Sequence, residues 1–336
     1  MATIPAHIDA LPSDAALGAM LDSHIAAAEA VRNALPALEK AAQQVAETLS
    51  RGGTLTYAAA GSSGLMALSD ASELAGTFGT APSQSRIAMA GGVPVDADMP
   101  GDTEDATDQT EAIAAAMGPQ DTAIILSASG TTPYALAVAK AVRDRGLPVI
   151  AIANVAQAPL LDLADIAIPL PTAPEVIEGS TRLGAGTAQK VALNMISTLA
   201  GILMGHVHDG LMVNLRPDNI KLRARAATIV TRITGVSQAQ AEAALEATDY
   251  DTKPAVLVAT GISVADARRL LAGHDNRLRP CRRWPVGGGS QAVSGRRGQA
   301  VWSLYCQRQS KPRRLPRRSV GGELRPDPAA TARRGS

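Results

Sequence analysis

Short apolar runs alternate with longer amphipathic segments between residues 54 and 170, and this alternation sets the fold class of the chain. Strands alternating with helices build βαβ units and a mainly parallel sheet. Aromatic residues are only 2% of the chain, so Ala, Leu, Val and Ile must fill the core, as is typical of helices and parallel strands. We therefore predict an α/β fold with three αβα layers. The expected strands are 54–60, 85–90, 121–127, 147–153 and 164–170. Three helices are expected between them: one begins near Gly64, one begins near Glu104, and one spans 132–146.

Helical patterns flank this alternation on both sides. Residues 14–51 form two helical segments that end at Gly52-Gly53. A nearly apolar helix is predicted over 185–204, in the core or in a subunit interface. Further helices are predicted over 218–235, 238–247, 252–259 and 263–272. The expected divisions are N-terminal helices at 1–52, an α/β domain at 53–235 and a small helical region at 236–280.

The last segment, 281–336, differs from the rest of the chain in charge. It holds 13 Lys and Arg against 2 Asp and Glu, a net of +11. Subtraction from the totals of 32 and 31 leaves 19 against 29 for residues 1–280, a net of −10. The segment shows no helix or strand period, which favours disorder. A basic tail is one interpretation, and an out-of-frame reading of a GC-rich gene is the one that we favour for so abrupt a change.

Several classes of protein are disfavoured by the composition. The sequence has no apolar run of about 18 residues, so we expect no membrane span. The N-terminal MATIPAHIDALPSD lacks a basic start and an apolar stretch, so we expect a cytoplasmic protein. Acidic residues balance basic ones in 14–51 and no recognition-helix pattern appears, so we expect no nucleic-acid partner.

Three Ser- and Gly-rich loops each follow a predicted strand and open a helix. Helix N-termini point inward at the carboxyl ends of parallel strands, where exposed N–H groups and hydroxyls bind anions. Any one loop can instead be a helix N-cap, but three in one βα frame indicate a phosphate site. The loops are 60–64, 127–132 and 178–187. Their candidate ligand-binding residues are Gly61, Ser62, Ser63, Ser127, Ser129, Thr131, Thr132, Glu178, Ser180, Thr181 and Lys190.

Cofactor and metal motifs find little support. The first loop lacks GxGxxG spacing and no GxxxxGK[ST] run occurs, so we expect neither NAD nor ATP and no other cofactor. His206 and His208 lie two residues apart after the apolar helix. A helix C-terminal cap explains them better than a metal pair, because no cysteine or third histidine is near.

Four stretches carry a resemblance to a known family: 57–74, 127–134, 173–195 and 210–226. Together they resemble the N-acetylmuramic acid 6-phosphate etherases, which belong to the sugar-isomerase (SIS) superfamily of phosphosugar-binding domains. The likeness covers roughly 14–280, and GSTRLGAGTAQK is its most specific part. It implies a flavodoxin-like SIS domain with a small C-terminal helical appendix.

The resemblance also implies a reaction and two catalytic residues. The family removes the D-lactyl ether from C3 of the 6-phosphosugar by elimination and hydration, in amino-sugar recycling, without metal or cofactor. Its two glutamates fall on Glu73 and Glu104. We interpret Glu73 as the acid for the leaving oxygen and Glu104 as the base at C2. From the residues alone, Glu73 can equally be a solvated helix residue and Glu104 a first-turn acid favoured by the helix dipole.

Helix geometry adds a prediction about assembly. If a helix runs unbroken from Gly64, Glu73 sits about 13 Å along its axis. That exceeds the reach from the 6-phosphate to C3 of a sugar. Either the helix breaks early, or Glu73 serves the site of a neighbouring subunit. We predict the second arrangement, a homodimer with shared active sites and a phosphorylated amino sugar as substrate.

Four residues depart from the family pattern: Leu65, Thr131, Gly184 and Ile220. The first three stand where the family has Arg, Arg and Lys, and Ile220 stands where it has an acidic residue. Lost charges near a phosphosugar site can change substrate preference. Two other functions therefore stay open, a phosphosugar-binding regulator and an aldose–ketose isomerase.

Overall fold

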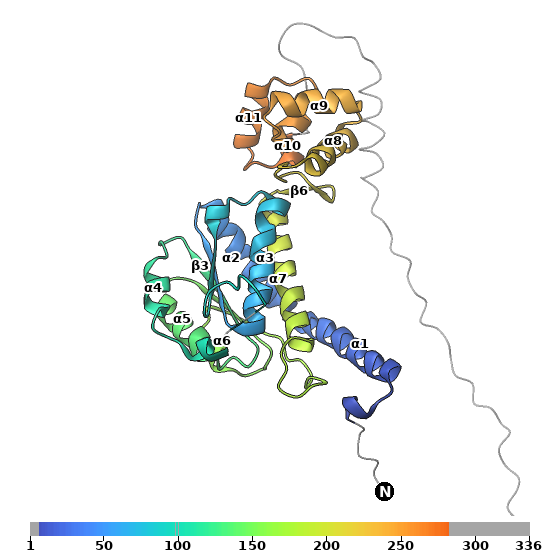
Figure 1. Ribbon diagram of the computed structural model, residues 1–336. Coiled ribbons are helices and arrows are strands. Elements are labelled where there is room, and N and C mark those ends of the chain that lie inside the picture. The colour runs from blue at the N-terminus through green and yellow to red at the C-terminus, as the bar shows by residue number, and fades with distance from the viewer. Residues whose placement is uncertain (1–6, 98, 100, 282–336) are drawn as a thin grey trace, which may run out of the picture. The chain divides into compact units, whose positions relative to one another are not determined.

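The computed structural model of the chain describes residues 7–97, 99 and 101–281. Its α/β region contains a five-stranded parallel sheet in the order β2-β1-β3-β4-β5 (Figure 1). The predicted mainly parallel sheet is thus confirmed. The strands are β1 (Leu55–Ala59), β2 (Ser85–Met89), β3 (Thr122–Ser127), β4 (Val149–Ala153) and β5 (Ile166–Pro169).

Two layers of helices cover the sheet, as the predicted αβα arrangement requires. Side chains alternate along each strand, so Tyr57 packs into one apolar cluster and Ala58 into the other. One face is covered by α1 (Ser13–Ala30), α2 (Leu35–Ser50), α3 (Gly61–Phe78) and α7 (Gly184–Leu203). The other face is covered by α4 (Thr110–Ala115), α5 (Pro133–Asp144) and α6 (Pro159–Asp162) (Figure 1).

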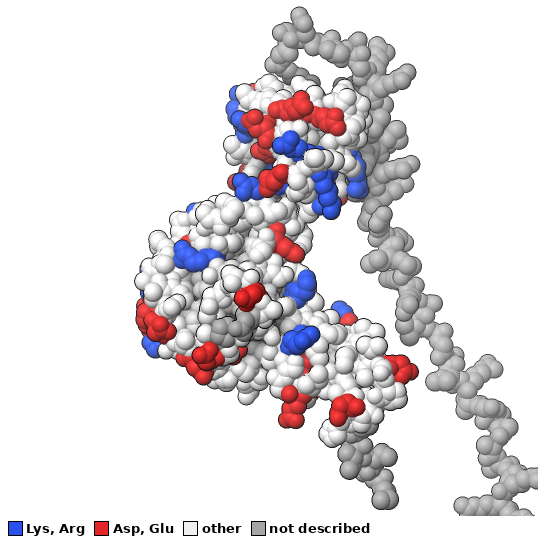
Figure 2. All heavy atoms as spheres, in the orientation of Figure 1, with Lys and Arg blue, Asp and Glu red and all other residues white. Residues whose placement is uncertain are grey.

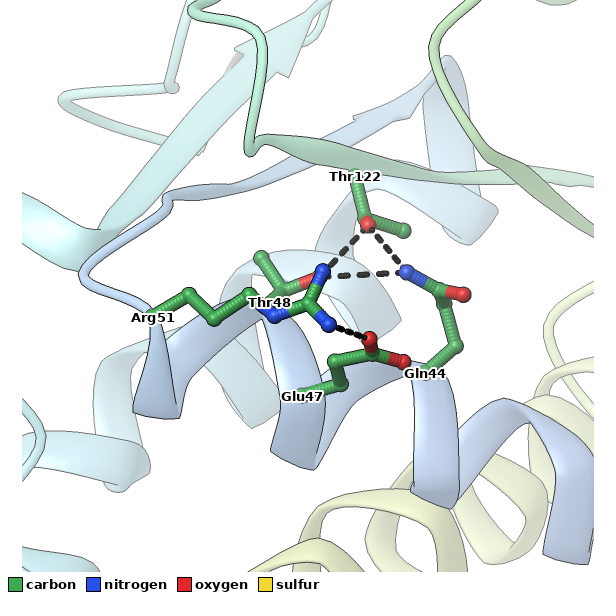
Figure 3. A network of polar contacts seen from close by, with 5 residues as sticks. All are labelled: Gln44, Glu47, Thr48, Arg51 and Thr122. Atoms are coloured by element: carbon green, nitrogen blue, oxygen red, sulfur yellow. Dashed lines mark hydrogen bonds and ion pairs between the residues drawn. The ribbon is translucent and has the colours of Figure 1, made fainter.

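A polar network joins α2 to the amino end of the central strand β3. Gln44 Nε2 donates to Thr122 Oγ1 over 3.2 Å, and the Thr48 and Thr122 hydroxyls lie 2.7 Å apart. On the exposed side of the same helix, Arg51 forms an ion pair with Glu47 (Figure 3). The buried threonine hydroxyls therefore satisfy each other beneath the sheet, which holds α2 in register with β3.

A third apolar cluster forms among the residues after α7. The short hairpin β6 (Val207–His208) and β7 (Leu211–Met212) leads into α8 (Ile220–Thr234). The helices that follow are α9 (Gln238–Ala247), α10 (Thr252–Val258), α11 (Val264–Ala272) and α12 (Leu278–Cys281). The helices predicted from residue 218 onward are confirmed, while α12 and the hairpin were not predicted.

Two predicted helix starts need correction. The helix expected from about Gly64 begins at Gly61, because the first turn already closes through Gly64 N–H to the Ala60 carbonyl at 3.0 Å. The prediction of a helix from about Glu104 is wrong. A 3₁₀ turn spans Gly101–Asp105, and α4 begins only at Thr110. No residue of that turn is buried, so tertiary packing does not stabilise a longer helix there.

Some predictions concern residues outside this description. The basic segment 282–336, with its proposed origin and disorder, lies outside the described residues, as do positions 1–6. The domain boundaries at 52, 235 and 280 stay predictions. Within the described residues, no helix has both the length and the apolar character that crossing a membrane would require.

Candidate functional site

A cleft of about 390 Å³ lies at the carboxyl edge of the sheet, beyond the ends of β1 and β2. Its walls come from the start of α3, the segment after β2 and the loop before α7. They include Gly61, Ser62, Met99, Glu104 and Thr181. Ligand sites of parallel α/β sheets lie at this edge, and the volume suits a small phosphorylated molecule.

The start of α3 provides the strongest anion-binding feature of the cleft. Ala60 is the N-cap and supplies no side-chain hydrogen bond, so the first N–H groups of the helix are not capped by that residue. Gly61 adopts a φ of 51°. A Cβ at Gly61 would approach Glu104 Oε1 to 2.5 Å, so glycine allows the helix start and the carboxylate to be neighbours. An uncapped helix start at a cleft is suited to phosphate.

The other predicted residue of this loop is buried behind the cleft. Ser63 is 6% exposed, and its hydroxyl accepts a hydrogen bond of 3.0 Å from Gln189 Nε2 on α7. The same amide nitrogen lies 2.9 Å from Asn154 Oδ1 at the end of β4. Ser63 therefore joins α3 to α7 and β4 rather than facing the cleft. Gln189 and Asn154 were not predicted from the sequence, because an amide at a helix or strand end has no distinctive pattern.

The second predicted loop, 127–132, is folded onto itself. Ser127 Oγ lies 2.9 Å from Thr132 Oγ1 and accepts from Gly130 N–H at 3.0 Å. Thr131 donates to Ser129 Oγ from both its backbone and its hydroxyl, at 3.2 and 2.9 Å. Gly130 has a φ of 68°, and a Cβ there would come within 2.4 Å of Ala158. The loop is thus preformed at the same sheet edge, with Ser129 and Thr131 exposed, but it does not line the cleft.

The third predicted loop caps its own helix. Glu175 accepts hydrogen bonds from Gly184 N–H at 3.0 Å and Ala185 N–H at 2.9 Å. The N-terminus of α7 therefore already holds a carboxylate. Thr181 lines the cleft, Glu178 is exposed and Ser180 is half-buried. The capping role of Glu175 was missed, since a cap nine residues ahead of its helix leaves no local sequence pattern.

Glu73 lies outside the cleft on an exposed part of α3. The helix is continuous from Gly61 to Phe78, so the early break considered above does not occur. Glu73 is twelve residues beyond Gly61, which corresponds to about 18 Å along the helix axis. The structure therefore brings Glu104 to the helix start and leaves Glu73 far from it within one chain.

A buried carboxylate, Asp70, lies one helical turn before Glu73. It is 3% exposed and accepts hydrogen bonds from Asn194 Nδ2 at 2.9 Å, Ser197 Oγ at 2.9 Å and the Tyr57 hydroxyl at 3.0 Å. Burial raises the pKa of Asp70 above its ordinary value, while these donors lower it and the charge of Glu73 adds to the rise. Asp70 thus links α3 to β1 and α7.

Lys190 is exposed on α7, outside the cleft. Its ammonium group donates to Asn194 Oδ1 over 2.5 Å, and the amide of Asn194 bonds Asp70. Asn194 also lines an apolar groove of about 590 Å³ between α2 and α7. Lys190 therefore lies near the groove, whereas the other predicted ligand residues belong to the three loops at the sheet edge.

The chain contains a SIS domain, since residues 22–154 match the SIS domain family. A phosphoheptose isomerase from Francisella tularensis is 19% identical with a TM-score of 0.41, covering 57% of this chain and 98% of that chain.

Closer relatives identify the family within this class. N-acetylmuramic acid 6-phosphate etherase from Deinococcus radiodurans is 38% identical over 271 residues, 80% of this chain and 89% of the relative. The etherase from Streptomyces avermitilis is 39% identical over 277 residues, 82% and 89% of the two chains. The chain belongs to the N-acetylmuramic acid 6-phosphate etherase family.

Proposed function

We propose that this protein is a lyase that cleaves N-acetylmuramic acid 6-phosphate to N-acetylglucosamine 6-phosphate and D-lactate. Family membership supports the reaction. The observation that carries it is the uncapped start of α3 with the Glu104 carboxylate beside Gly61. A phosphate-binding group and a carboxylate base then share one cleft. We further propose that the enzyme works in the cytoplasm.

The phosphate of the substrate would occupy the start of α3. The backbone N–H groups there and the hydroxyls of Ser62 and Thr181 supply donors from two walls of the cleft. Each hydrogen bond to a charged group contributes about 1.5–3 kcal/mol. The loop 127–132, whose residues hydrogen-bond one another, follows the neighbouring strand β3 at the same edge of the sheet. Its exposed Ser129 and Thr131 would reach substrate atoms beyond the phosphate.

The chemistry requires a base and an acid on the open-chain aldehyde. Glu104 would remove the C2 proton, and the electron pair would form the C2–C3 double bond as the C3–O bond breaks. Glu73 would give its proton to the departing lactate oxygen. Water then adds across the double bond, with hydroxyl at C3 and hydrogen at C2. Two carboxyl groups in different protonation states suit this sequence.

The distance between the two glutamates leads to a shared site. About 18 Å of helix separates the start of α3 from Glu73 in one chain, more than a monosaccharide spans. We therefore propose a homodimer in which Glu104 of one subunit works with Glu73 of the partner subunit. In a two-fold dimer the same surface contacts itself, so two equivalent sites form.

The proposed dimer surface is apolar and comes from α1, α2 and α7. The groove between α2 and α7 is lined by Leu35, Val191, Met195, Leu199 and Ile202, among others. Beside it, α1 exposes three large apolar side chains, Leu17 (66% exposed), Leu21 (59%) and Ile25 (54%). Charged side chains are sparse over α1 (Figure 2). Apolar surface of this kind marks an interaction site.

The family departures would act on substrate binding rather than on the chemistry. Gly184, which stands where the family pattern has Lys, donates its N–H to Glu175. Ile220 is 88% exposed at the start of α8. Leu65 is half-buried in α3 and Thr131 is exposed in the second loop. We propose that the missing cations at positions 65, 131 and 184 weaken binding of the anionic substrate.

Release of D-lactate tests the proposal. Purified protein incubated with N-acetylmuramic acid 6-phosphate should yield D-lactate and N-acetylglucosamine 6-phosphate in equal amounts. Glu104→Gln should lower kcat by about 10²- to 10⁴-fold, the usual contribution of general base catalysis. Binding without lactate release would instead indicate a regulator, and conversion of an aldose 6-phosphate to its ketose would indicate an isomerase.

A further inference from the structure

One wall of the cleft is mostly apolar, and it comes from the segment that follows β2. Val93, Val95 and Met99 line the cleft, together with Pro94 and Asp96. The exposed fractions of the two valines and the methionine are 46%, 96% and 38%, so solvent reaches all three. Single exposed apolar side chains are common on protein surfaces, but several around one cleft mark a binding surface. We call Val93, Val95 and Met99 the apolar wall.

A buried methionine extends this apolar surface to the start of α3. Met89, the last residue of β2, lines the cleft and is only 8% exposed. A Cβ at Gly64 would lie 2.9 Å from Met89 Sδ, so the methionine packs directly against α3. Close packing leaves such a side chain little room to rearrange. The apolar surface of the cleft is therefore anchored in the core at one end.

The segment that carries the apolar wall also carries the proposed base. It leaves β2 through a turn in which Gly92 N–H donates to the Met89 carbonyl at 2.9 Å. A Cβ at Gly91 would lie 2.9 Å from Thr103 Cγ2, so the two ends of the segment are in contact. Thr103 immediately precedes Glu104. The apolar wall and the Glu104 carboxylate are thus held at the same cleft by one closed segment.

The cleft lining also includes polar groups from other elements. Ser62 at the start of α3 and Thr181 in the loop before α7 carry hydroxyls, and the Glu104 carboxylate lies beside Gly61. Ligand sites commonly combine apolar contact surface with a few polar groups that fix orientation. This lining therefore suits a phosphorylated molecule that also carries a small apolar group.

The proposed reaction decides which group of the substrate meets the apolar wall. Glu104 would take the proton from C2, and C2 carries the acetamido group. The acetamido group would therefore stay close to Glu104 and to the segment that holds it. The lactyl group on C3 would instead face the proposed acid, Glu73 of the partner subunit. Of the two methyl-bearing groups on the sugar, the acetamido methyl is the one that this wall can cover.

We propose that Val93, Val95 and Met99 form an acyl subsite that binds the methyl of the 2-acetamido group. The inference rests on the proposed function, because the pose follows from Glu104 acting at C2. Contact with the methyl removes apolar surface of the sugar and of the exposed valines from water, which favours binding. The subsite would make the cleft selective for 6-phosphosugars whose C2 nitrogen carries an acyl group with an apolar end.

Isothermal titration calorimetry of the full-length protein with two sugar phosphates tests the acyl subsite. The probes are N-acetylglucosamine 6-phosphate and N-formylglucosamine 6-phosphate, which differ only in the methyl group. The wild-type protein should bind the acetyl form about fourfold more tightly, the effect of burying one methyl group. The double variant Val95→Thr, Met99→Gln makes the wall polar at similar size and should bring this ratio to about 1.

Two matched variants separate the acyl subsite from other effects on binding. Val155 is 44% exposed and is not among the residues that line the cleft, so Val155→Thr should leave both affinities unchanged. Ser62→Ala removes a hydroxyl proposed to bind the phosphate, so it should weaken both probes equally and preserve their ratio. If the double variant does not fold, Val95→Thr alone carries the test, because Val95 is almost fully exposed.

The acyl subsite and the proposed function fail in different ways. Equal binding of the two probes by the wild-type protein, or a ratio that survives the double variant, overturns the subsite alone. Absence of D-lactate release contradicts the proposed function, and the binding ratio still tests the wall because it needs no turnover. If neither probe binds up to about 10 mM, tenfold above a millimolar dissociation constant, both proposals are overturned.

Discussion

The two glutamates proposed for catalysis lie in contrasting surroundings. Glu104 sits in a walled cleft beside a glycine that admits it, at the start of α3. Glu73 sits on the exposed surface of the same helix, one turn from the buried Asp70 and outside the cleft. We therefore propose that one chain supplies the binding half of a site and that a neighbouring copy supplies the other half. If the proposal holds, the reaction is divided between two copies of the chain.

The largest effect should come from breaking the proposed dimer surface. Met195 lines the groove and is 38% exposed. The substitution Met195→Asp would place a carboxylate in the proposed apolar interface. We expect monomers and a loss of lactate release of about 100-fold or more, because the acid is lost with the partner. Sedimentation velocity and the lactate assay measure both quantities.

Ile220→Asp is the matched control for Met195→Asp. It replaces an exposed apolar side chain, 88% accessible on α8, by the same acid. The oligomeric state should not change in this variant. A dimeric and fully active Met195→Asp protein would contradict the proposed interface.

A smaller effect concerns Asp70, the buried carboxylate one helical turn before Glu73. The pKa of Asp70 is raised in the folded state, so the native protein holds this proton more tightly than the unfolded chain. The associated stability is present at low pH and declines as pH rises through the folded pKa. Asp70→Asn should therefore flatten the fall of unfolding free energy with rising pH in urea titrations.

Tyr57→Phe provides the comparison for this pH dependence. It removes one donor to Asp70 and should cost about 1.5–3 kcal/mol at pH 7, as expected for a hydrogen bond to a charged group. It keeps the carboxyl, so the pH slope should persist. Equal slopes in the wild-type and Asp70→Asn proteins would show that Asp70 does not control this dependence.

The sequence predicts the sheet well because the signals are local and repeated. Apolar runs such as 149–153 are buried on both faces, and a parallel strand needs that pattern. The Ser- and Gly-rich loops are also predictable, since each must leave a strand and start a helix. The resemblance to the etherases then placed Glu104 where the structure has a cleft.

Contacts distant in sequence could not be predicted in the same way. Glu175 caps α7 across a loop, and Gln189 bonds a serine 126 positions away. The acidic residues around Glu104 are equally compatible with a helix and a turn. No residue of Gly101–Asp105 is buried, so packing does not stabilise a longer helix there and a 3₁₀ turn forms. Such choices depend on packing, which periodicity does not record.

Mixing two inactive variants tests the shared site most directly. Glu73→Gln and Glu104→Gln proteins, unfolded and refolded together in equal amounts, should form about half mixed dimers, each with one intact site. Lactate release should recover to about a quarter of the wild-type rate, while each variant refolded alone stays inactive. No recovery, with mixed dimers demonstrated by mass spectrometry, would contradict the division of the active site between two subunits.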